Sequence, residues 1–439
     1  MTHSRSFLII AFLLVLASSL QAQEKEYIAL GKEFIKLFEE KQFAECMPFV
    51  DASIKDKLTV TSLESIHTQI HSKLGKLVKQ QGELFEDDTT YQLVYIGCEF
   101  ENQKLDYKIV FNPQKKLIGF FLVAPVEKVQ YSLPPYAHLD SIIEIPMVIT
   151  SDTFKLAATL TIPKSANHPP IVVMVQGSGP QDRDESVHAN KPFKDLAFGL
   201  AAHGIATLRY DKRTYVYSSA TSLDIARLTP KQEVTDDALA AIKFMRYQLD
   251  LDTSRIYLLG HSLGAMMAPR IAAEDKRLAG MIMMAAPARP FEDVLLDQME
   301  FLLPQQLAKQ KADSQLANIR QTIKKVKAHN YKDTTSSSAL LGLSPAYWDY
   351  LRKYDQIKTA KSLTTPMLVL QGGKDYQVSK KDFHLWKESL VTNDNVSFEY
   401  FDNLYHLFMI GAGTYTDYDA PSHIPMPVID RIAWWVKNH

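Results

Sequence analysis

Cysteine is scarce in this sequence. Only Cys46 and Cys98 occur among 439 residues, and both lie far upstream of the motif residues described below. A cysteine nucleophile is therefore disfavoured. The two residues either form a disulfide or remain as two buried free thiols, and the sequence leaves both possibilities open.

An excess of charge of one sign is also missing. The chain has 49 Lys and Arg against 50 Asp and Glu, a formal net charge of −1. Because nucleic acids and anionic membrane surfaces attract proteins with an excess of positive charge, neither is an expected partner. Hydrophobic residues make up 46% of the chain and charged residues 23%, which is typical of a globular protein.

One hydrophobic run stands out, and it lies at the N-terminus. His3 and Arg5 precede apolar residues 7–16, and small residues follow as far as Ala22. The run is too short for a comfortable membrane span, but its basic start and small-residue end are typical of a signal peptide. We expect residues 1–22 to be cleaved off, no stable membrane span to remain, and the protein to be secreted or periplasmic.

Residues 23–125 predict a small α+β domain. Apolar residues at helical spacing indicate helices over 26–46 and 62–80. Three strand-like runs follow, at 91–100, 105–111 and 117–124. Helices followed by antiparallel strands are typical of an α+β domain, and a linker is expected at 126–137. The domain resembles the cystatin- or NTF2-like domains that often precede secreted hydrolases, and a homodimer contact is one role it could have.

The pattern changes over residues 138–439. Two runs at 142–149 and 154–162 resemble a hairpin, and an all-apolar run at 171–175 is typical of a parallel strand buried on both faces. Helices near 191–202, 231–249, 263–273, 380–391 and 427–437 then alternate with strands at 205–210, 255–260, 279–285, 366–371 and 396–401. This alternation predicts a doubly wound, mostly parallel α/β sheet.

A long insertion interrupts the alternation at about 287–362. Its composition, rich in Leu, Gln, Lys and Ala, predicts helices over 292–310 and 313–329 and a Ser/Thr-rich turn at 334–338. An insertion of this length outside the sheet is typical of a cap over an active site. Tyr347 and Trp348 would either line the pocket beneath it or belong to the packed core.

A catalytic motif lies inside the alternating region. An apolar run leads into Gly260-His261-Ser262-Leu263-Gly264, and a segment of small residues follows. G-x-S-x-G between a strand and a helix is a nucleophile elbow, in which the glycines leave room for a sharp turn that exposes the serine. Ser262 is therefore the candidate nucleophile. The backbone N–H of Leu263 is a candidate donor to the oxyanion.

A serine nucleophile needs a histidine base and an acid that orients it. In this fold both follow the serine, the acid first. Asp375 comes after a predicted strand and a turn with two glycines, and it is the candidate acid, although an Asp there could also cap a turn. His406 follows the last predicted strand and is the candidate base. His423, in a Pro-rich tail, is the alternative, and His384 lies inside a predicted helix.

A second oxyanion donor is expected after the buried strand at 171–175. Gln176-Gly177-Ser178-Gly179-Pro180 follows this strand, and its glycines allow the backbone to approach a substrate. The N–H of Ser178 is the candidate donor.

These motifs occur in series with those of a known family. The series comprises Gly177-Ser178-Gly179-Pro180-Gln181-Asp182-Arg183-Asp184, Lys191-Pro192-Phe193, Leu208-Arg209-Tyr210-Asp211-Lys212-Arg213, the pentapeptide at 260–264, Gln371-Gly372 with Asp375-Tyr376-Gln377-Val378, and His406-Leu407-Phe408. Residues 138–439 resemble the α/β-hydrolase superfamily, specifically secreted bacterial carboxylesterases of the EstD type. The resemblance implies a triad of Ser262, Asp375 and His406. Many relatives have His where this chain has Gln176, which puts the orientation of that loop in doubt.

The sequence therefore predicts hydrolysis of a small or medium carboxylic ester through an acyl-serine intermediate. The same triad also serves serine aminopeptidases, thioesterases and acyltransferases, and the fold does not choose between them. A non-catalytic binding module is the alternative from another class. Because a triad needs no cofactor, we expect neither a cofactor nor a metal ion. Arg183 and Arg213 are expected to brace loops through buried ion pairs, with a site for a substrate carboxylate as the alternative.

Overall fold

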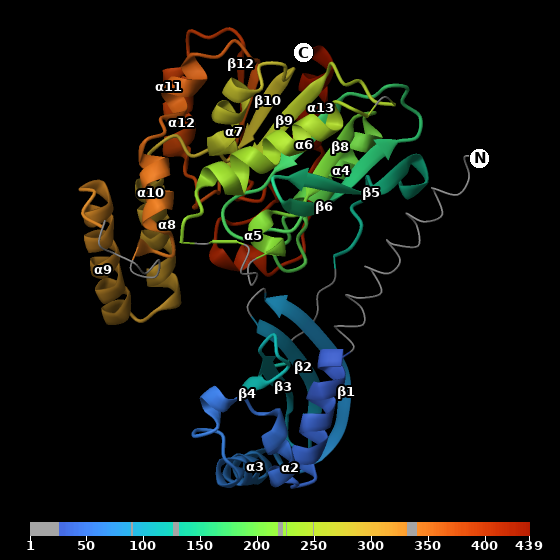
Figure 1. The fold of residues 1–439 in the computed structure, drawn as a ribbon, viewed down its shortest axis with the longest axis vertical. Coiled ribbons are helices and arrows are strands. Elements are labelled where there is room, and N and C mark those ends of the chain that lie inside the picture. Colours follow the sequence, from blue (N-terminus) through green and yellow to red (C-terminus); the bar gives the residue numbers. More distant parts are fainter. Residues whose placement is uncertain are drawn as a thin grey trace. The chain divides into compact units, whose positions relative to one another are not determined.

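The computed structural model describes residues 26–88, 91–125, 131–217, 223–224, 226–248, 250–331 and 340–439. The chain divides into two compact units between Lys128 and Val129 (Figure 1). The predicted signal peptide at 1–22 and the predicted turn at 334–338 lie outside the described residues. Within the described ranges, we find no helix with the length and apolar character needed to cross a membrane.

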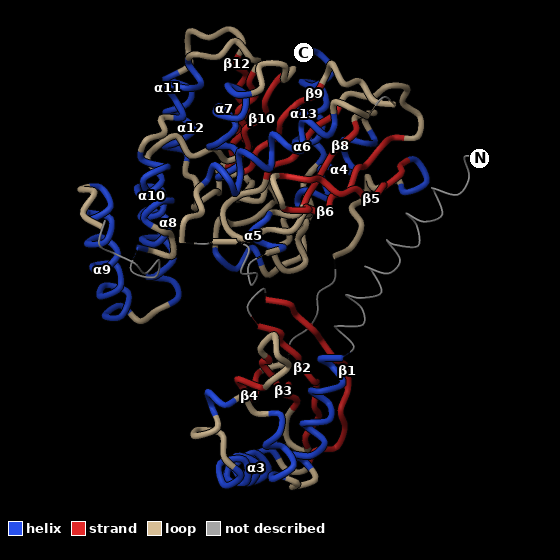
Figure 2. Tube along the Cα trace, in the orientation of Figure 1, coloured by secondary structure: helices blue, strands red, loops and turns tan. Residues whose placement is uncertain are grey.

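The N-terminal unit is an α+β domain, as predicted. A helix over 26–39, α2 (Phe43–Cys46) and α3 (Val60–Leu74) precede an antiparallel sheet with the order β1-β2-β3-β4 (Figure 2). The strands are β1 (Leu77–Asp88), β2 (Tyr91–Phe100), β3 (Lys104–Phe111) and β4 (Leu117–Val123). Phe34 and Phe38 of the first helix pack with apolar residues of the sheet into one buried core.

The predicted helix over 62–80 is wrong beyond Leu74, because strand β1 begins at Leu77. Gly75 ends α3 with a φ of 79°, and Leu77 begins the strand. Leu77 and Val78 fit the apolar spacing of the preceding helix. Because β1 lies at the edge of the sheet and is mostly polar, its sequence lacks the apolar alternation by which the other three strands were predicted.

Cys46 and Cys98 are both free and buried in the core of this unit. Burial raises the pKa of Cys46 to about 11 and that of Cys98 to about 12. Neither residue is a thiolate at neutral pH, so neither is a nucleophile. Of the two possibilities left open by the sequence, the structure contains the two free thiols.

The second unit is built on an eight-stranded sheet with the order β12-β11-β10-β9-β7-β8-β6-β5. The strands are β5 (Ile142–Ser151), β6 (Phe154–Pro163), β7 (Ile171–Val175), β8 (Ala206–Tyr210), β9 (Ile256–His261), β10 (Gly280–Met284), β11 (Met367–Gly372) and β12 (Val396–Phe401). The β5–β6 and β6–β8 pairs are antiparallel, and the strands from β8 to β12 pair in parallel. The predicted mostly parallel sheet is confirmed.

Helices cover both faces of this sheet (Figure 1). They include α4 (Pro192–Ala202), α6 (Asp237–Met245), α7 (Leu263–Glu274), α12 (Lys380–Ser389) and α13 (Met426–Asn438). Side chains of β7 alternate between two buried cores: Val173 packs in the core of α6, α7 and α12, and Met174 in the core of α4 and α13. This double burial explains the all-apolar run at 171–175.

The insertion between β10 and β11 forms the predicted helical cap. Its described helices are α8 (Phe291–Gln306), α9 (Lys309–Lys327), α10 (Pro345–Arg352) and α11 (Gln356–Lys361). Tyr347 and Trp348 are buried in packed core, where the Trp348 indole N–H donates to the Leu340 carbonyl oxygen at 3.0 Å. The cap therefore uses these two aromatic residues for packing.

Part of the predicted linker at 126–137 belongs to the second unit. The Tyr131 hydroxyl donates to Oδ1 of Asp195 at 2.8 Å, and the Tyr136 hydroxyl donates to the Ile424 carbonyl oxygen at 2.7 Å. Residues 126–130 lie outside the described residues.

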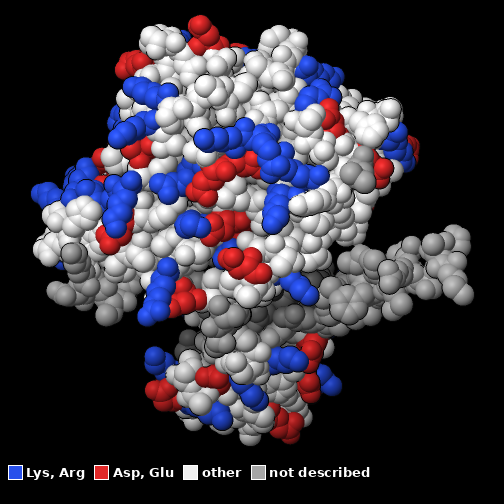
Figure 3. All heavy atoms as spheres, turned by 45° about the horizontal axis from the view of Figure 1, so that its top comes forward, with Lys and Arg blue, Asp and Glu red and all other residues white. Residues whose placement is uncertain are grey.

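Basic and acidic side chains are interspersed on the face of the second unit shown in Figure 3. This distribution agrees with the nearly equal numbers of basic and acidic residues in the sequence.

Candidate active site

Ser262 lies in a sharp turn between β9 and α7. Its backbone has φ 52° and ψ −116°, a strained conformation for a residue with a side chain. The turn also needs glycine on both sides of the serine. A Cβ on Gly260 would lie 2.4 Å from the Gly264 carbonyl oxygen, and one on Gly264 would lie 2.2 Å from the Val175 carbonyl oxygen. The sequence motif thus folds into the strained strand–turn–helix of a nucleophile elbow.

His406 and Asp375 come from the loops that follow β12 and β11. Nδ1 of His406 lies 2.8 Å from Oδ2 of Asp375. Since a carboxylate only accepts, Nδ1 carries the proton and Nε2 is left to act as a base. The other carboxylate oxygen accepts the backbone N–H groups of Gln377 and Val378 at 2.8 and 2.9 Å. The acid is thereby fixed in position, and both partner side chains are at most 6% exposed.

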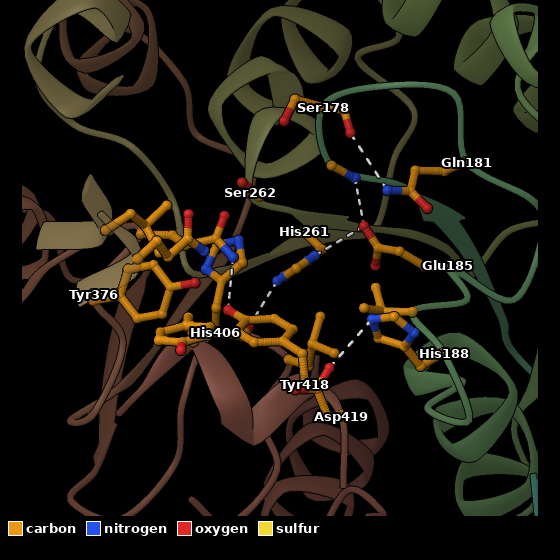
Figure 4. A pocket seen from close by; sticks show the side chains of 17 residues that line it. Ser178, Gln181, Glu185, His188, His261, Ser262, Tyr376, His406, Tyr418 and Asp419 are labelled. Carbon is orange, nitrogen blue, oxygen red and sulfur yellow. Dashed lines mark hydrogen bonds and ion pairs between the residues drawn. The ribbon is translucent and has the colours of Figure 1, made fainter. Parts of the chain in front are cut away.

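Ser262 and His406 line one cavity of about 500 Å³. Figure 4 shows Ser262 between Ser178 and His406 at this cavity. Further lining comes from helix α8 of the cap and from two loops near the C-terminus, through Leu302, Gln306, Tyr376, Tyr415 and Tyr418. The aromatic surface is therefore supplied by tyrosines that the sequence analysis did not identify.

The segment 176–180, here called the oxyanion loop, packs against the nucleophile. A Cβ on Gly177 would lie 3.2 Å from Cβ of Ser262. The Gly177 N–H is already engaged, because it donates to Oε1 of Glu185 at 2.6 Å. The next residue, Ser178, lines the cavity. Leu263 is the first residue of α7, where backbone N–H groups have no partner within the helix.

Glu185 and His261 form a buried pair beside the nucleophile, which the sequence analysis missed. Nδ1 of His261 lies 2.9 Å from Oε1 of Glu185, and Nε2 lies 2.9 Å from the His406 carbonyl oxygen. Because a carbonyl and a carboxylate both accept, the ring donates from both nitrogens and is an imidazolium. Burial lowers the pKa of His261, but the charge and hydrogen bond of Glu185, the hydrogen bond to the His406 carbonyl and the charge of Asp375 together hold this pKa above its usual value.

This pair connects all three segments that carry the candidate machinery. Glu185 binds the Gly177 amide of the oxyanion loop, and His261 precedes Ser262 and holds the backbone at His406 (Figure 4). A shift of either side chain would therefore move several groups at once. The two residues are 76 positions apart in the sequence, so no local pattern could have paired them.

Lys212 holds the oxyanion loop from the other side. Its Nζ donates to the carbonyl oxygens of Gly177 and Gly179 at 2.8 and 2.9 Å. The side chain is 2% exposed and pairs with Glu233 at 3.0 Å, and Glu233 in turn accepts the Tyr347 hydroxyl of the cap at 2.8 Å. Lys212 therefore holds the carbonyl groups of the oxyanion loop, and Glu233 links Lys212 to Tyr347 of the cap.

Gln176, where the family resemblance implied a His, anchors the start of the oxyanion loop. Its side-chain amide donates to the carbonyl oxygen of Asp182 at 3.2 Å and to that of Tyr210. Gln176 thus ties the start of the loop to the end of β8.

Arg183 and Arg213 act as braces. Nε and Nη2 of Arg183 donate to the two oxygens of Asp211 at 2.9 and 2.7 Å. Arg213 is buried and pairs with the buried Asp237. Since neither arginine lines the cavity, these contacts confirm the bracing interpretation over a site for a substrate carboxylate.

Other histidines considered above lie away from the cavity. His423 pairs with Asp195 at 3.2 Å, and His384 is exposed on α12. Among the described residues, the one group with the composition and spacing to hold a metal ion includes His67 and His71 of the N-terminal unit.

Two protein families match the chain, one in each of its two units. Residues 187–411 match the family described as "Serine aminopeptidase, S33", and residues 31–120 match the family described as "Protein of unknown function (DUF3887)". Esterase EstD of Thermotoga maritima is 34% identical over 405 residues, which cover 92% of this chain and 93% of that protein.

Solved structures of esterases resemble the chain at lower identity. Est1E from Butyrivibrio proteoclasticus with ferulic acid bound is 16% identical, with a TM-score of 0.46 over 67% of this chain and 100% of that one. An esterase of Pyrococcus furiosus is 15% identical, with a TM-score of 0.44 over 72% of this chain and 98% of that one.

Proposed function

We propose that this chain, which belongs to the serine aminopeptidase (S33) family of α/β-hydrolases, hydrolyses carboxylic esters through an acyl-Ser262 intermediate. The relative that matches 92% of the chain at 34% identity is named an esterase. The observation that carries the proposal is the buried His406–Asp375 hydrogen bond of 2.8 Å beside a cavity that Ser262 also lines.

In this mechanism Nε2 of His406 takes the hydroxyl proton of Ser262 as Oγ attacks the ester carbonyl. Asp375 keeps the imidazole in the required tautomer and stabilises it when it becomes charged. The backbone N–H groups of Ser178 and Leu263 hold the negative charge that develops on the carbonyl oxygen. His406 then protonates the leaving alcohol. Finally it deprotonates a water molecule, which attacks the acyl-serine, and it returns this proton to Oγ of Ser262 as the acid leaves.

The dimensions of the cavity support a small or medium ester as the substrate. A volume of about 500 Å³ lies within the usual range for small-molecule sites, roughly 300–1,000 Å³. Tyrosine rings offer flat apolar faces, and the ring of Tyr376 is stacked on Phe301 of α8 with centroids 4.4 Å apart. The wall of the site is thereby tied to the cap, which we propose selects the acyl or alcohol group.

Turnover of p-nitrophenyl esters tests this proposal. We expect the purified chain to release p-nitrophenol from acetate and butyrate esters. The Ser262→Ala variant should release none above the buffer rate. Equal release by the wild-type chain and this variant would contradict the proposed function.

An aminopeptidase activity is the second candidate, and one residue favours it. Asp419 lines the cavity and its side chain is 65% exposed, so it could bind the free amine of a peptide. It also lies 3.5 Å from His188. Aminoacyl p-nitroanilides distinguish the two activities: a higher kcat/KM for these amides than for the esters, lost on Asp419→Asn, would identify an aminopeptidase.

The contacts of Lys212 predict a selective loss of catalytic rate. Lys212→Met keeps the length of the side chain but leaves the Gly177 and Gly179 carbonyls without their donor. We expect kcat for p-nitrophenyl acetate to fall by about 10²-fold, the effect of displacing a catalytic group by about 1 Å, with KM nearly unchanged. Lys243→Met, an exposed position on α6, is the matched control. A variant with wild-type kcat would show that Lys212 does not position the loop.

A further inference from the structure

His67 and His71 lie one turn apart on α3, and both approach Glu39, which belongs to the helix over 26–39. Each of the three residues offers one metal-ligand atom, and these atoms lie within 4.8 Å of one another. The two imidazole centroids are 4.1 Å apart, and Nε2 of His71 is 3.0 Å from Oε2 of Glu39. The sequence analysis expected no metal ion and passed over the His-x-x-x-His spacing, which places two side chains on one face of a helix.

Each of the two rings donates a hydrogen bond from the nitrogen that faces away from this group. Nδ1 of His71 is 3.0 Å from the Gly75 carbonyl oxygen, which can only accept, so Nδ1 carries the proton. His67 hydrogen-bonds to the backbone of Glu39. Because Nε2 of His67 has no hydrogen-bond partner among the described residues, we assign that bond to Nδ1.

Two imidazole Nε2 atoms without a hydrogen-bond partner among the described residues therefore lie beside a carboxylate. Nε2 of His71 makes no hydrogen bond, although Oε2 of Glu39 is only 3.0 Å away. A metal ion binds to imidazole nitrogens that carry no proton, and it would occupy these two positions.

The surroundings fix these groups in place and leave one side open. The Tyr107 hydroxyl donates to Oε1 of Glu39 at 2.6 Å, which leaves Oε2 free toward His71. Phe38 packs edge-on against His67 with centroids 5.3 Å apart. The side chains of His71 and Glu39 are 21% and 13% exposed, so an ion and a water ligand can enter from that side. Backbone hydrogen bonds to both imidazoles are the usual support of metal-binding histidines.

We propose that His67, His71 and Glu39 bind one divalent transition-metal ion, with Zn²⁺ as the ion of best fit. Two imidazoles and a carboxylate suit Zn²⁺, whereas Mg²⁺ and Ca²⁺ prefer oxygen ligands alone. Ligand atoms about 2.1 Å from a tetrahedral zinc are about 3.4 Å apart. The His71–Glu39 separation of 3.0 Å is already close to this value, and all three ligand atoms lie within 4.8 Å of one another. The ion would link the first helix to α3.

Metal titration of the full chain, purified without a histidine tag and stripped with EDTA, tests the proposal. We expect one equivalent of Zn²⁺ to bind, measured by calorimetry, and one equivalent of Co²⁺ to give visible absorption bands with nitrogen ligation. Zn²⁺ should raise the unfolding temperature of the N-terminal unit, because an ion that binds only the folded state stabilises it. Glu39→Gln should weaken binding at least tenfold, and His71→Gln at least 100-fold.

Matched variants separate this site from surface binding. His384→Ala removes an exposed helical histidine from the other unit and should leave the stoichiometry and the Co²⁺ spectrum unchanged. Glu39→Gln retains an oxygen for the Tyr107 hydroxyl, so it should fold even where His71→Gln does not, and circular dichroism checks both. No stoichiometric uptake by the wild-type chain would overturn the proposal and indicate a His71–Glu39 ion pair instead. Equal affinity of the wild-type chain and Glu39→Gln would also overturn it, because Glu39 would then not be a ligand.

Discussion

Replacing Asp375 with asparagine should lower kcat/KM for ester hydrolysis by about 10⁴-fold, the effect of holding a triad histidine in the wrong tautomer. In the wild-type chain Oδ2 of Asp375 accepts the Nδ1 proton of His406 at 2.8 Å. An asparagine can keep its oxygen on the backbone N–H groups of Gln377 and Val378, which the structure places 2.8 and 2.9 Å from Oδ1. Its NH₂ group would then face Nδ1, so the imidazole proton would move to Nε2. Nε2 would have no lone pair left to accept the hydroxyl proton of Ser262.

Two controls isolate this effect from a disturbance of the loop. The unfolding temperature of Asp375→Asn should stay near the wild-type value, because the two backbone contacts of the loop through Oδ1 are retained. Asp419→Asn changes an exposed carboxylate at the same cavity and should alter kcat/KM for esters by less than about threefold, since Asp419 does not contact His406. An Asp375→Asn variant within tenfold of the wild-type rate would remove Asp375 from the proposed mechanism.

The sequence predicts this part of the site because each candidate side chain follows a strand. Ser262, Asp375 and His406 lie in the turn or loop that follows β9, β11 and β12, and the carboxyl ends of parallel strands meet at one edge of a sheet. Buried strands such as β7 are apolar throughout, and they can be recognised without knowledge of their neighbours. The local sequence pattern and the rule about the carboxyl ends of parallel strands were therefore sufficient to select these three candidate residues.

Features that depend on distant partners could not be predicted in this way. Strand β1 is polar and becomes a strand only through its pairing with β2, so the apolar spacing at Leu77 and Val78 was read as helix. The role of Lys212 depends on two carbonyl groups of the oxyanion loop, more than 30 residues upstream. Neither the residue type of Lys212 nor its position in the sequence indicates contacts of this kind.

Glu185 is the strongest example, and it predicts a large effect on stability. Its carboxylate is buried against His261 and held with a backbone φ of 53°, an unfavourable value for a residue with a side chain. Glu185→Gln keeps the shape of the side chain but removes its charge. We expect the free energy of unfolding at pH 6, measured in urea, to fall by about 3 kcal/mol. This is the lower end of the range for breaking a buried ion pair, because the His261 ring can lose its proton.

The pH dependence of this loss identifies the imidazolium as its cause. Glu185 raises the pKa of His261 in the folded state, so the resulting stabilisation is complete below the ordinary value of about 6.5 and disappears as the pH rises through the raised pKa. The difference between wild-type and Glu185→Gln should therefore be largest near pH 6 and should shrink toward pH 9. Asp430→Asn, which breaks an exposed pair with His203 of the same 2.9 Å length, should cost less than about 1 kcal/mol at either pH. A loss in Glu185→Gln that does not vary with pH would show that His261 is neutral in the wild-type chain.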